Sequence, residues 1–201
     1  MMKSEYEIID NAFAPEVFKD ISDWFLSNTF PWFHQSMVAY PDEVENGNEP
    51  HITMWKFTSD EMSQEDIDLI NKPLTPIQER YNFTETHIVY DNNEILTSRE
   101  TWSKVQWVLT RINSKSLIRM KVNSYPRTEE LVHHKDHFDL PYAHKGGILY
   151  FNANDGVTVL EDGTEVESVP NRILLFDSSK PHHSTTTTNA NRRVNLNFNY
   201  F

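Results

Sequence analysis

The chain has 201 residues and no cysteine, and its 30 Asp and Glu outnumber its 18 Lys and Arg, which gives a formal net charge of −12. This length suits one domain with a sizeable core, and no Pro/Gly/Ser-rich linker divides the chain, so we predict a single domain over residues 1–201. Without cysteine, disulfides, thiolate nucleophiles and sulfur-ligated metal sites are excluded. The acidic balance argues against a nucleic-acid partner bound through its phosphate backbone, although a nucleotide in a local pocket is compatible with it.

The N-terminal residues predict no targeting segment. They lack the apolar core of a signal peptide, and nothing in the chain approaches the unbroken apolar run of a membrane helix. We therefore expect no membrane partner and a cytoplasmic location.

The front of the chain, about residues 1–104, is expected to be mainly helical after a short strand at residues 5–9. Apolar side chains recur at helical spacing, and proline and hydroxyl residues stand where helices begin. The expected helices are residues 14–28 with Pro15 in the first turn, a second helix that Ser63 caps and that runs through Ile67 and Ile70, and residues 75–81 after Thr75.

Residues 30–50 are polar and interrupted by prolines, and they predict a long loop. Loops of this length are uncommon unless they serve as lids or binding loops. Trp32, Phe33 and Met37 therefore have two interpretations that stay open. They close over a binding site, or they cover an edge of the fold.

From about Val105 to the C-terminus the pattern changes to strands. Turn signals separate eight short strands from Leu117 on. They are residues 117–124, the segment that ends in HFD, and residues 147–152, 157–160, 164–168, 172–176, 182–187 and 193–200. Helices followed by eight strands predict an α+β, mainly β, fold: a sandwich or barrel with the N-terminal helices packed on one sheet.

The segment HHKDHFDL contains two overlapping H-x-D patterns, His134 with Asp136 and His137 with Asp139. Side chains two residues apart on a strand point to the same face, so either copy aims an imidazole and a carboxylate at one point. A single H-x-D is a weak signal in a chain with nine histidines.

A third ligand must come from another strand, because two ligands hold a transition metal weakly. The segment KPHHS offers His182 or His183, and His182 lies 45 residues after His137. Two histidines and one carboxylate on one side of a metal are typical of non-haem Fe(II) oxygenases, and they leave three coordination positions open. The sequence thus favours a metal site with nitrogen and oxygen ligands only.

The last expected strand, residues 193–200, has an apolar face and a polar face. The polar face consists of Arg193, Asn195, Asn197 and Asn199. Such a face usually meets solvent. The alternative is that it lines a wet cavity inside a barrel, which would seat Arg193 near the metal, positioned to bind a carboxylate through two hydrogen bonds.

Together these segments resemble the Fe(II)/2-oxoglutarate dioxygenases, above all the prolyl-4-hydroxylase-like members, which include short phage forms. The matching pieces are MKVNSYPRTEE, HFD, GILYFN, DGTEVES, RILLFDSSKPH and RRVNLNFNYF. They cover residues 117–201 well, whereas the front matches only in outline, through YEIIDNAFAPEVF and FPWF. The resemblance implies a double-stranded β-helix of the jelly-roll or cupin-like kind: two four-stranded sheets that form an open barrel with iron inside.

The resemblance also implies residue roles and cofactors. The implied metal ligands are His137, Asp139 and His182; the implied 2-oxoglutarate contacts are Arg193 and Tyr150 at the distal carboxylate, with Tyr125 as a further pocket tyrosine. The implied cofactors are Fe(II), 2-oxoglutarate as co-substrate, and dioxygen.

The second H-x-D copy is the preferred one. His137 and Asp139 keep the spacing to GILYFN that the resemblance requires, and Phe138 between them would face the packed side. With His134 as the ligand, the charged Lys135 would occupy that packed place. His133 and His134 are then expected in solvent or next to the ligands, and His183 is expected to point away from the cavity if His182 points into it.

The implied activity is hydroxylation of a C–H bond with release of succinate and CO2. By analogy the substrate is a peptide or protein side chain, with a small molecule still open, and a phage-encoded form would act in the host cytoplasm. Two alternatives are a non-catalytic β-barrel, either a binding or a viral structural protein, and a cupin-like metalloenzyme that does not use 2-oxoglutarate. An inward-facing Arg193 discriminates, because a plain binding barrel has no need of it. The oligomeric state is not indicated.

Overall fold

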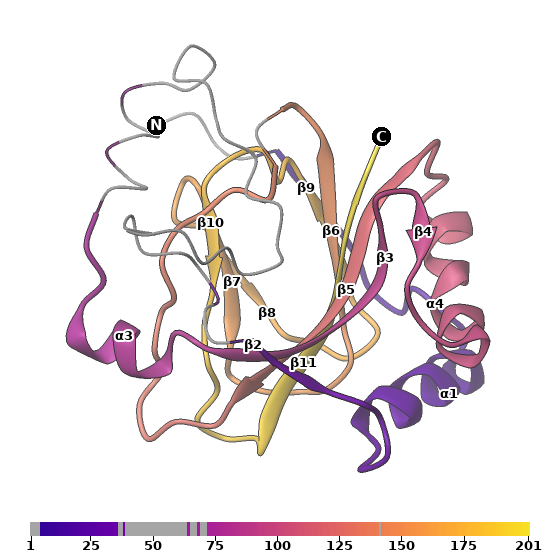
Figure 1. Ribbon diagram of the computed structural model, residues 1–201, viewed down its shortest axis with the longest axis horizontal. Coiled ribbons are helices and arrows are strands. Elements are labelled where there is room, and N and C mark those ends of the chain that lie inside the picture. Colours follow the sequence, from indigo (N-terminus) through magenta and orange to yellow (C-terminus); the bar gives the residue numbers. More distant parts are fainter. Residues whose placement is uncertain (1–4, 36–37, 39–63, 65–67, 69–71, 141) are drawn as a thin grey trace.

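The computed structural model describes residues 5–35, 38, 64, 68, 72–140 and 142–201 (Figure 1). The expected second helix with Ser63, Ile67 and Ile70, the side chain of Met37 and most of the 30–50 loop lie outside these residues. No helix in the described ranges is long and apolar enough to cross a membrane.

The described chain is mainly β, with two of its three helices grouped on one side and the short third helix apart from them (Figure 1). The strands are β1 Tyr6–Ile9, β2 Phe33–Gln35, β3 Thr84–Asp91, β4 Glu94–Ile95, β5 Leu117–Pro126, β6 Lys145–Tyr150, β7 Val157–Leu160, β8 Glu165–Glu167, β9 Ile173–Phe176, β10 His182–Ser184 and β11 Arg192–Tyr200, and the helices are α1 Pro15–Leu26, α3 Pro76–Tyr81 and α4 Arg99–Arg111. The larger sheet has the order β1-β9-β6-β11-β5-β3-β2, with β4 on β3, and the smaller sheet has the order β10-β7-β8. This confirms the predicted α+β, mainly β, fold.

The smaller sheet gains a fourth member that is not a regular strand. Isolated bridges join Arg127 to Thr187, His133 to Thr185 and His137 to His182. The segment that ends in HFD, one of the eight expected strands, therefore runs beside β10. It pairs only at these points and does not form a regular strand. The other seven strands expected after Leu117 are present.

Two expectations for the front of the chain are wrong. Strands do not begin near Val105, because α4 continues to Arg111, and the front also contains β3, a strand inside the larger sheet. Ser98 starts α4 by accepting a hydrogen bond from the Thr101 backbone at 3.1 Å. The β-branched residues of α4 resemble a strand in sequence, whereas β3 is a strand because it pairs with β5, which local propensity does not reveal.

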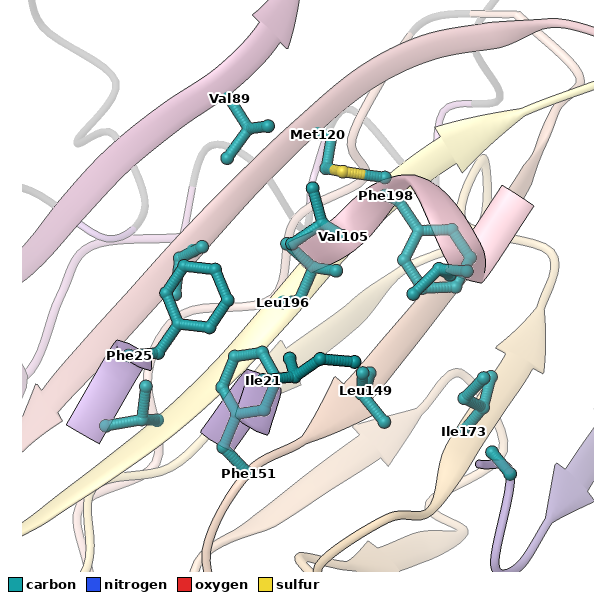
Figure 2. Packing of buried hydrophobic residues seen from close by; sticks show 14 of the residues in the cluster. Ile21, Phe25, Val89, Val105, Met120, Leu149, Phe151, Ile173, Leu196 and Phe198 are labelled. Atoms are coloured by element: carbon teal, nitrogen blue, oxygen red, sulfur yellow. The ribbon is translucent and has the colours of Figure 1, made fainter. Parts of the chain in front are cut away.

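Helices α1 and α4 cover one face of the larger sheet (Figure 2). Ile21 and Phe25 of α1 share a buried cluster with Val105 of α4. From the sheet, the cluster takes in Leu149 of β6, Val122 of β5, and Leu196 and Phe198 of β11. This confirms the predicted packing on one sheet for α1 and α4, whereas α3 has no buried residue.

The packing of β11 decides between the two interpretations of its polar face. Its apolar residues point to the helices, so the alternation of the strand turns the polar row toward the other sheet. Arg193, Asn195, Asn197 and Asn199 are all buried. The polar row lines the interior, and the solvent-facing interpretation is wrong.

At the start of the 30–50 loop, Trp32 packs against the core. Its ring lies 4.8 Å from that of Phe30 and 5.5 Å from the Arg192 guanidinium. Phe33, in contrast, is 60% exposed. These contacts favour the edge-covering interpretation for Trp32.

Asp155 holds the turn that leads into β11 and so sets where Arg193 lies. Its carboxylate accepts hydrogen bonds from the Thr187 hydroxyl at 2.7 Å, the Thr188 backbone at 2.8 Å and the Thr188 hydroxyl. Burial alone would raise the pKa of Asp155, but these hydrogen bonds lower it below its ordinary value. The ionised carboxylate is therefore the form that stabilises the fold.

We expect Asp155→Asn to lower the free energy of unfolding by about 1–3 kcal/mol near neutral pH, because the amide accepts fewer of these hydrogen bonds. The pKa of Asp155 is lower in the folded state than in the unfolded state, where it is about 4. The carboxylate therefore stabilises the fold fully at pH values above about 4, and this stabilisation is lost as the pH falls below that value. The difference between native protein and variant should thus shrink between about pH 5 and pH 3 in urea unfolding. Glu94→Gln, at an exposed site, is the control; equal stability of the Asp155 variant and native protein would contradict the assignment.

Candidate metal centre

Three side chains able to bind a metal meet between the two sheets. His137 lies in the bridged segment, Asp139 follows it by two residues, and His182 opens β10. Reciprocal backbone N–H···O=C hydrogen bonds of 3.0 Å and 2.9 Å join the two histidines. One ligand atom of each of the three residues lies within 4.8 Å of the other two. The structure thus brings together the three residues of the second H-x-D interpretation.

Both imidazoles present the same nitrogen to this point. Nδ1 of His137 donates to the Lys135 carbonyl at 3.3 Å, and Nδ1 of His182 donates to the Lys180 carbonyl at 2.9 Å. A carbonyl only accepts, so Nε2 keeps its lone pair in each ring. Burial lowers the pKa of His137 to about 3 and also lowers the pKa of His182. Both rings are therefore neutral near pH 7, which is the form that binds metals.

Both carboxylate oxygens of Asp139 are held in place. Arg119 Nη2 donates to Oδ1 at 3.0 Å, and Asn199 Nδ2 donates to Oδ2 at 2.8 Å. Oδ2 also lies 3.9 Å from His182 Nε2. Burial alone would raise the pKa of Asp139, but the charge of Arg119, with the histidines and Lys121, lowers it below its ordinary value. The group is ionised and aimed at the two imidazoles.

The first H-x-D copy does not form such a group. Nδ1 of His183 donates to Asp136 Oδ1 at 2.6 Å, and His183 Nε2 lies 3.0 Å from Nδ1 of His133. The side chain of His134 is instead buried, and its Nδ1 lies 3.0 Å from the Ser184 hydroxyl. Asp136 thus bonds with His183 and His134 with Ser184, so the two residues of this copy do not converge on one point.

Arg193 lies on the inner face of β11, at the opposite end of the strand from Asn199, and has 0% exposure. Its guanidinium donates to Ser168 Oγ at 2.8 Å, Thr158 Oγ1 at 3.0 Å and the Thr185 carbonyl at 3.3 Å. Within the described ranges no carboxylate pairs with it. The guanidinium also interacts with Tyr150, and these contacts do not occupy all five of its N–H groups. A buried cation of this kind fits an anionic ligand.

The rings of Tyr125 and Tyr150 flank this guanidinium, with centroids 5.4 Å and 5.7 Å from it. The Tyr150 hydroxyl donates to Thr158 Oγ1 at 2.9 Å. Burial raises the pKa of both tyrosines, so both hydroxyls stay protonated. At Gly156 a Cβ would lie 2.5 Å from Arg193 Cδ, so only glycine leaves room for the arginine. The three residues expected at the 2-oxoglutarate site therefore adjoin one another.

Sequence patterns alone do not single out Arg119 and Asn199. Arg119 belongs to the polar face of β5 and Asn199 to the polar face of β11, as the alternation of each strand indicates. The two residues stand opposite each other where β5 and β11 pair. Only that register, together with the position of Asp139, reveals that they share one carboxylate.

The donor set fits Fe(II). Two imidazole nitrogens and one carboxylate oxygen, with no sulfur, form the three-ligand arrangement that non-haem iron oxygenases use. The hydrogen bonds to each Nδ1 and to Asp139 supply the outer contacts that orient such ligands.

No known protein-family model matches the chain, and no curated protein matches it. Solved structures do. A prolyl-4-hydroxylase from Pseudomonas putida superposes with a TM-score of 0.50 at 11% identity, over 98% of this chain and 93% of its own. A prolyl hydroxylase from Trichoplax adhaerens, solved with a peptide fragment of the hypoxia inducible factor oxygen degradation domain, gives 0.51 at 13%, over 98% and 84%.

An oxidoreductase of the 2OG-Fe(II) oxygenase family from Burkholderia pseudomallei is also similar, with a TM-score of 0.43 at 11% identity. That match covers 59% of this chain and 66% of the other, just under two thirds of its length. From the two longer matches we conclude that the chain has the fold of the prolyl hydroxylases, as the sequence resemblance predicted.

Proposed function

We propose that the protein is an Fe(II)- and 2-oxoglutarate-dependent dioxygenase that hydroxylates a C–H bond and releases succinate and CO2. The observation that carries the proposal is the pairing of two features on one interior surface. A group of two histidines and one carboxylate lies near one end of the polar row of β11, and a buried arginine without an acidic partner in the described ranges lies at the other end.

His137, Asp139 and His182 would hold Fe(II) from one side. With 2-oxoglutarate and dioxygen, the metal supplies the oxidising power for C–H cleavage. Arg119 and Asn199 keep the Asp139 carboxylate ionised and oriented. Because both imidazoles are already neutral and fixed by their Nδ1 hydrogen bonds, little reorganisation precedes metal binding.

Arg193 would bind the distal carboxylate of 2-oxoglutarate, with Tyr150 and Tyr125 beside it. A guanidinium suits this role because its N–H groups match the two oxygens of a carboxylate. Burial strengthens the attraction, since little water screens it. The same burial keeps bulk water from competing for the arginine.

For the substrate we propose a peptide or protein side chain. The Trichoplax adhaerens prolyl hydroxylase of similar fold was solved with a bound peptide fragment, which supports this class without identifying a sequence. We further propose that the protein acts in the cytoplasm, or in the host cytoplasm if it is phage-encoded.

We expect His137→Ala to weaken Fe(II) binding by roughly 100-fold or more, because it removes one of three ligands. Anaerobic titration calorimetry measures this. His34→Ala, at an exposed histidine, and His134→Ala should keep native affinity. Loss of binding in His134→Ala with retention in His137→Ala would instead assign the metal to the first H-x-D copy.

We expect Arg193→Met to abolish the rise in melting temperature that 2-oxoglutarate gives the Mn(II)-loaded native protein, a rise that corresponds to about 2.7 kcal/mol at 100 times Kd. Mn(II) affinity should persist, because Arg193 contacts none of the three ligands. Arg192→Met, at the neighbouring arginine that faces Trp32, is the matched control.

The same titrations separate the competing functions. Native protein that binds the metal but not 2-oxoglutarate would indicate a cupin-like metalloenzyme. Native protein that binds neither would indicate a non-catalytic barrel. Binding of both, followed by succinate release after air is admitted, supports the dioxygenase.

A further inference from the structure

His134 is a buried histidine that is not part of the metal triad and has hydrogen-bonding capacity left over. It is 2% exposed, its backbone N–H donates to the Ser184 carbonyl at 2.9 Å, and its Nδ1 lies 3.0 Å from the Ser184 hydroxyl. Its other nitrogen, Nε2, is buried and has no hydrogen-bond partner among the described residues. A buried polar atom without a partner destabilises the fold, so its presence calls for a ligand.

The surroundings of His134 are those of the proposed 2-oxoglutarate site. Its ring lies 5.2 Å from the ring of Tyr125, and the Arg193 guanidinium lies 5.4 Å from that same tyrosine ring. Burial, followed by the charge of Arg193, lowers the pKa of His134 to about 3. The imidazole is therefore neutral and carries one N–H.

The Ser184 hydroxyl decides which nitrogen holds that proton. When this hydroxyl donates to Nδ1, the proton lies on Nε2, and His134 offers a donor beside Tyr125, whose ring Arg193 also contacts. Arg193 itself has N–H groups left over after its three hydrogen bonds. Two neighbouring residues thus have unused donors, which is the complement of a carboxylate with two oxygens.

We propose that His134 binds the distal carboxylate of 2-oxoglutarate through Nε2–H, together with Arg193, and so helps the site to select a dicarboxylate. The inference rests on the proposed function and adds a residue to its co-substrate site. Both groups are buried, so little water competes with a carboxylate for them.

Two substitutions separate the contact from packing. His134→Asn keeps a polar atom near the position of Nδ1 but has nothing at Nε2, whereas His134→Gln extends an N–H donor toward the position of Nε2. We expect the asparagine variant to bind 2-oxoglutarate about 10- to 100-fold more weakly and the glutamine variant to stay within about 3-fold of native. Calorimetry on the Mn(II)-loaded full chain measures both.

A second ligand tests which end of the co-substrate His134 contacts. 2-Oxopentanoate has the same keto acid end but a methyl group in place of the distal carboxylate. Its affinity should be the same in native protein and in His134→Asn, and Mn(II) affinity should not change either. A merely structural role would weaken both keto acids equally, and that result overturns the proposal.

The outcomes also distinguish this inference from the proposed function. Native protein that binds 2-oxoglutarate while His134→Asn binds it equally well overturns only the role of His134. Native protein that binds no 2-oxoglutarate overturns both. Should the asparagine variant fail to fold, the 15N shift of Nε2 in native protein gives the answer: it should change on addition of 2-oxoglutarate but not of 2-oxopentanoate, and an unchanged shift overturns the proposal.

Discussion

The two-residue period of β11 is the constraint on which the rest of the structure depends. This strand pairs with β5 on one edge and β6 on the other, and the residues on both its faces are buried. Val194, Leu196 and Phe198 must face the helices to complete the core, and this forces Arg193 and Asn199 inward. A slip of one residue would turn the polar row toward the helices and the apolar row into the interior, so the register that stabilises the core also builds the interior site.

The buried charges of the interior are not fully balanced among the described residues, and bound ligands would balance them. Arg119 already offsets the charge of Asp139, whereas Arg193 has no acidic partner in the described ranges. A buried charge is unfavourable unless another charge compensates it. Because Asp139 is already paired with Arg119, the distal carboxylate of 2-oxoglutarate would supply the negative charge that Arg193 lacks.

The sequence predicted those parts of the fold and site that depend on local period. Alternation located seven of the eight strands after Leu117, and helical spacing located α1. It failed for α4, whose valines and threonines suggest a strand, and for β3, whose burial comes from pairing with β5. Arg119 was out of reach for the same reason, because its role at Asp139 depends on contacts between distant segments.

The burial of His134 beside Ser184 has a more specific cause. His137 is four positions after His133, whereas their bridge partners Thr185 and His182 are only three positions apart. The HFD segment therefore contains one extra residue, as a β-bulge does, and strict alternation fails within it. In a regular strand His134 and His137 would face opposite sides, so one H-x-D would exclude the other. With the extra residue, both histidines turn inward beside β10, one at the metal triad and one at Ser184 near Arg193.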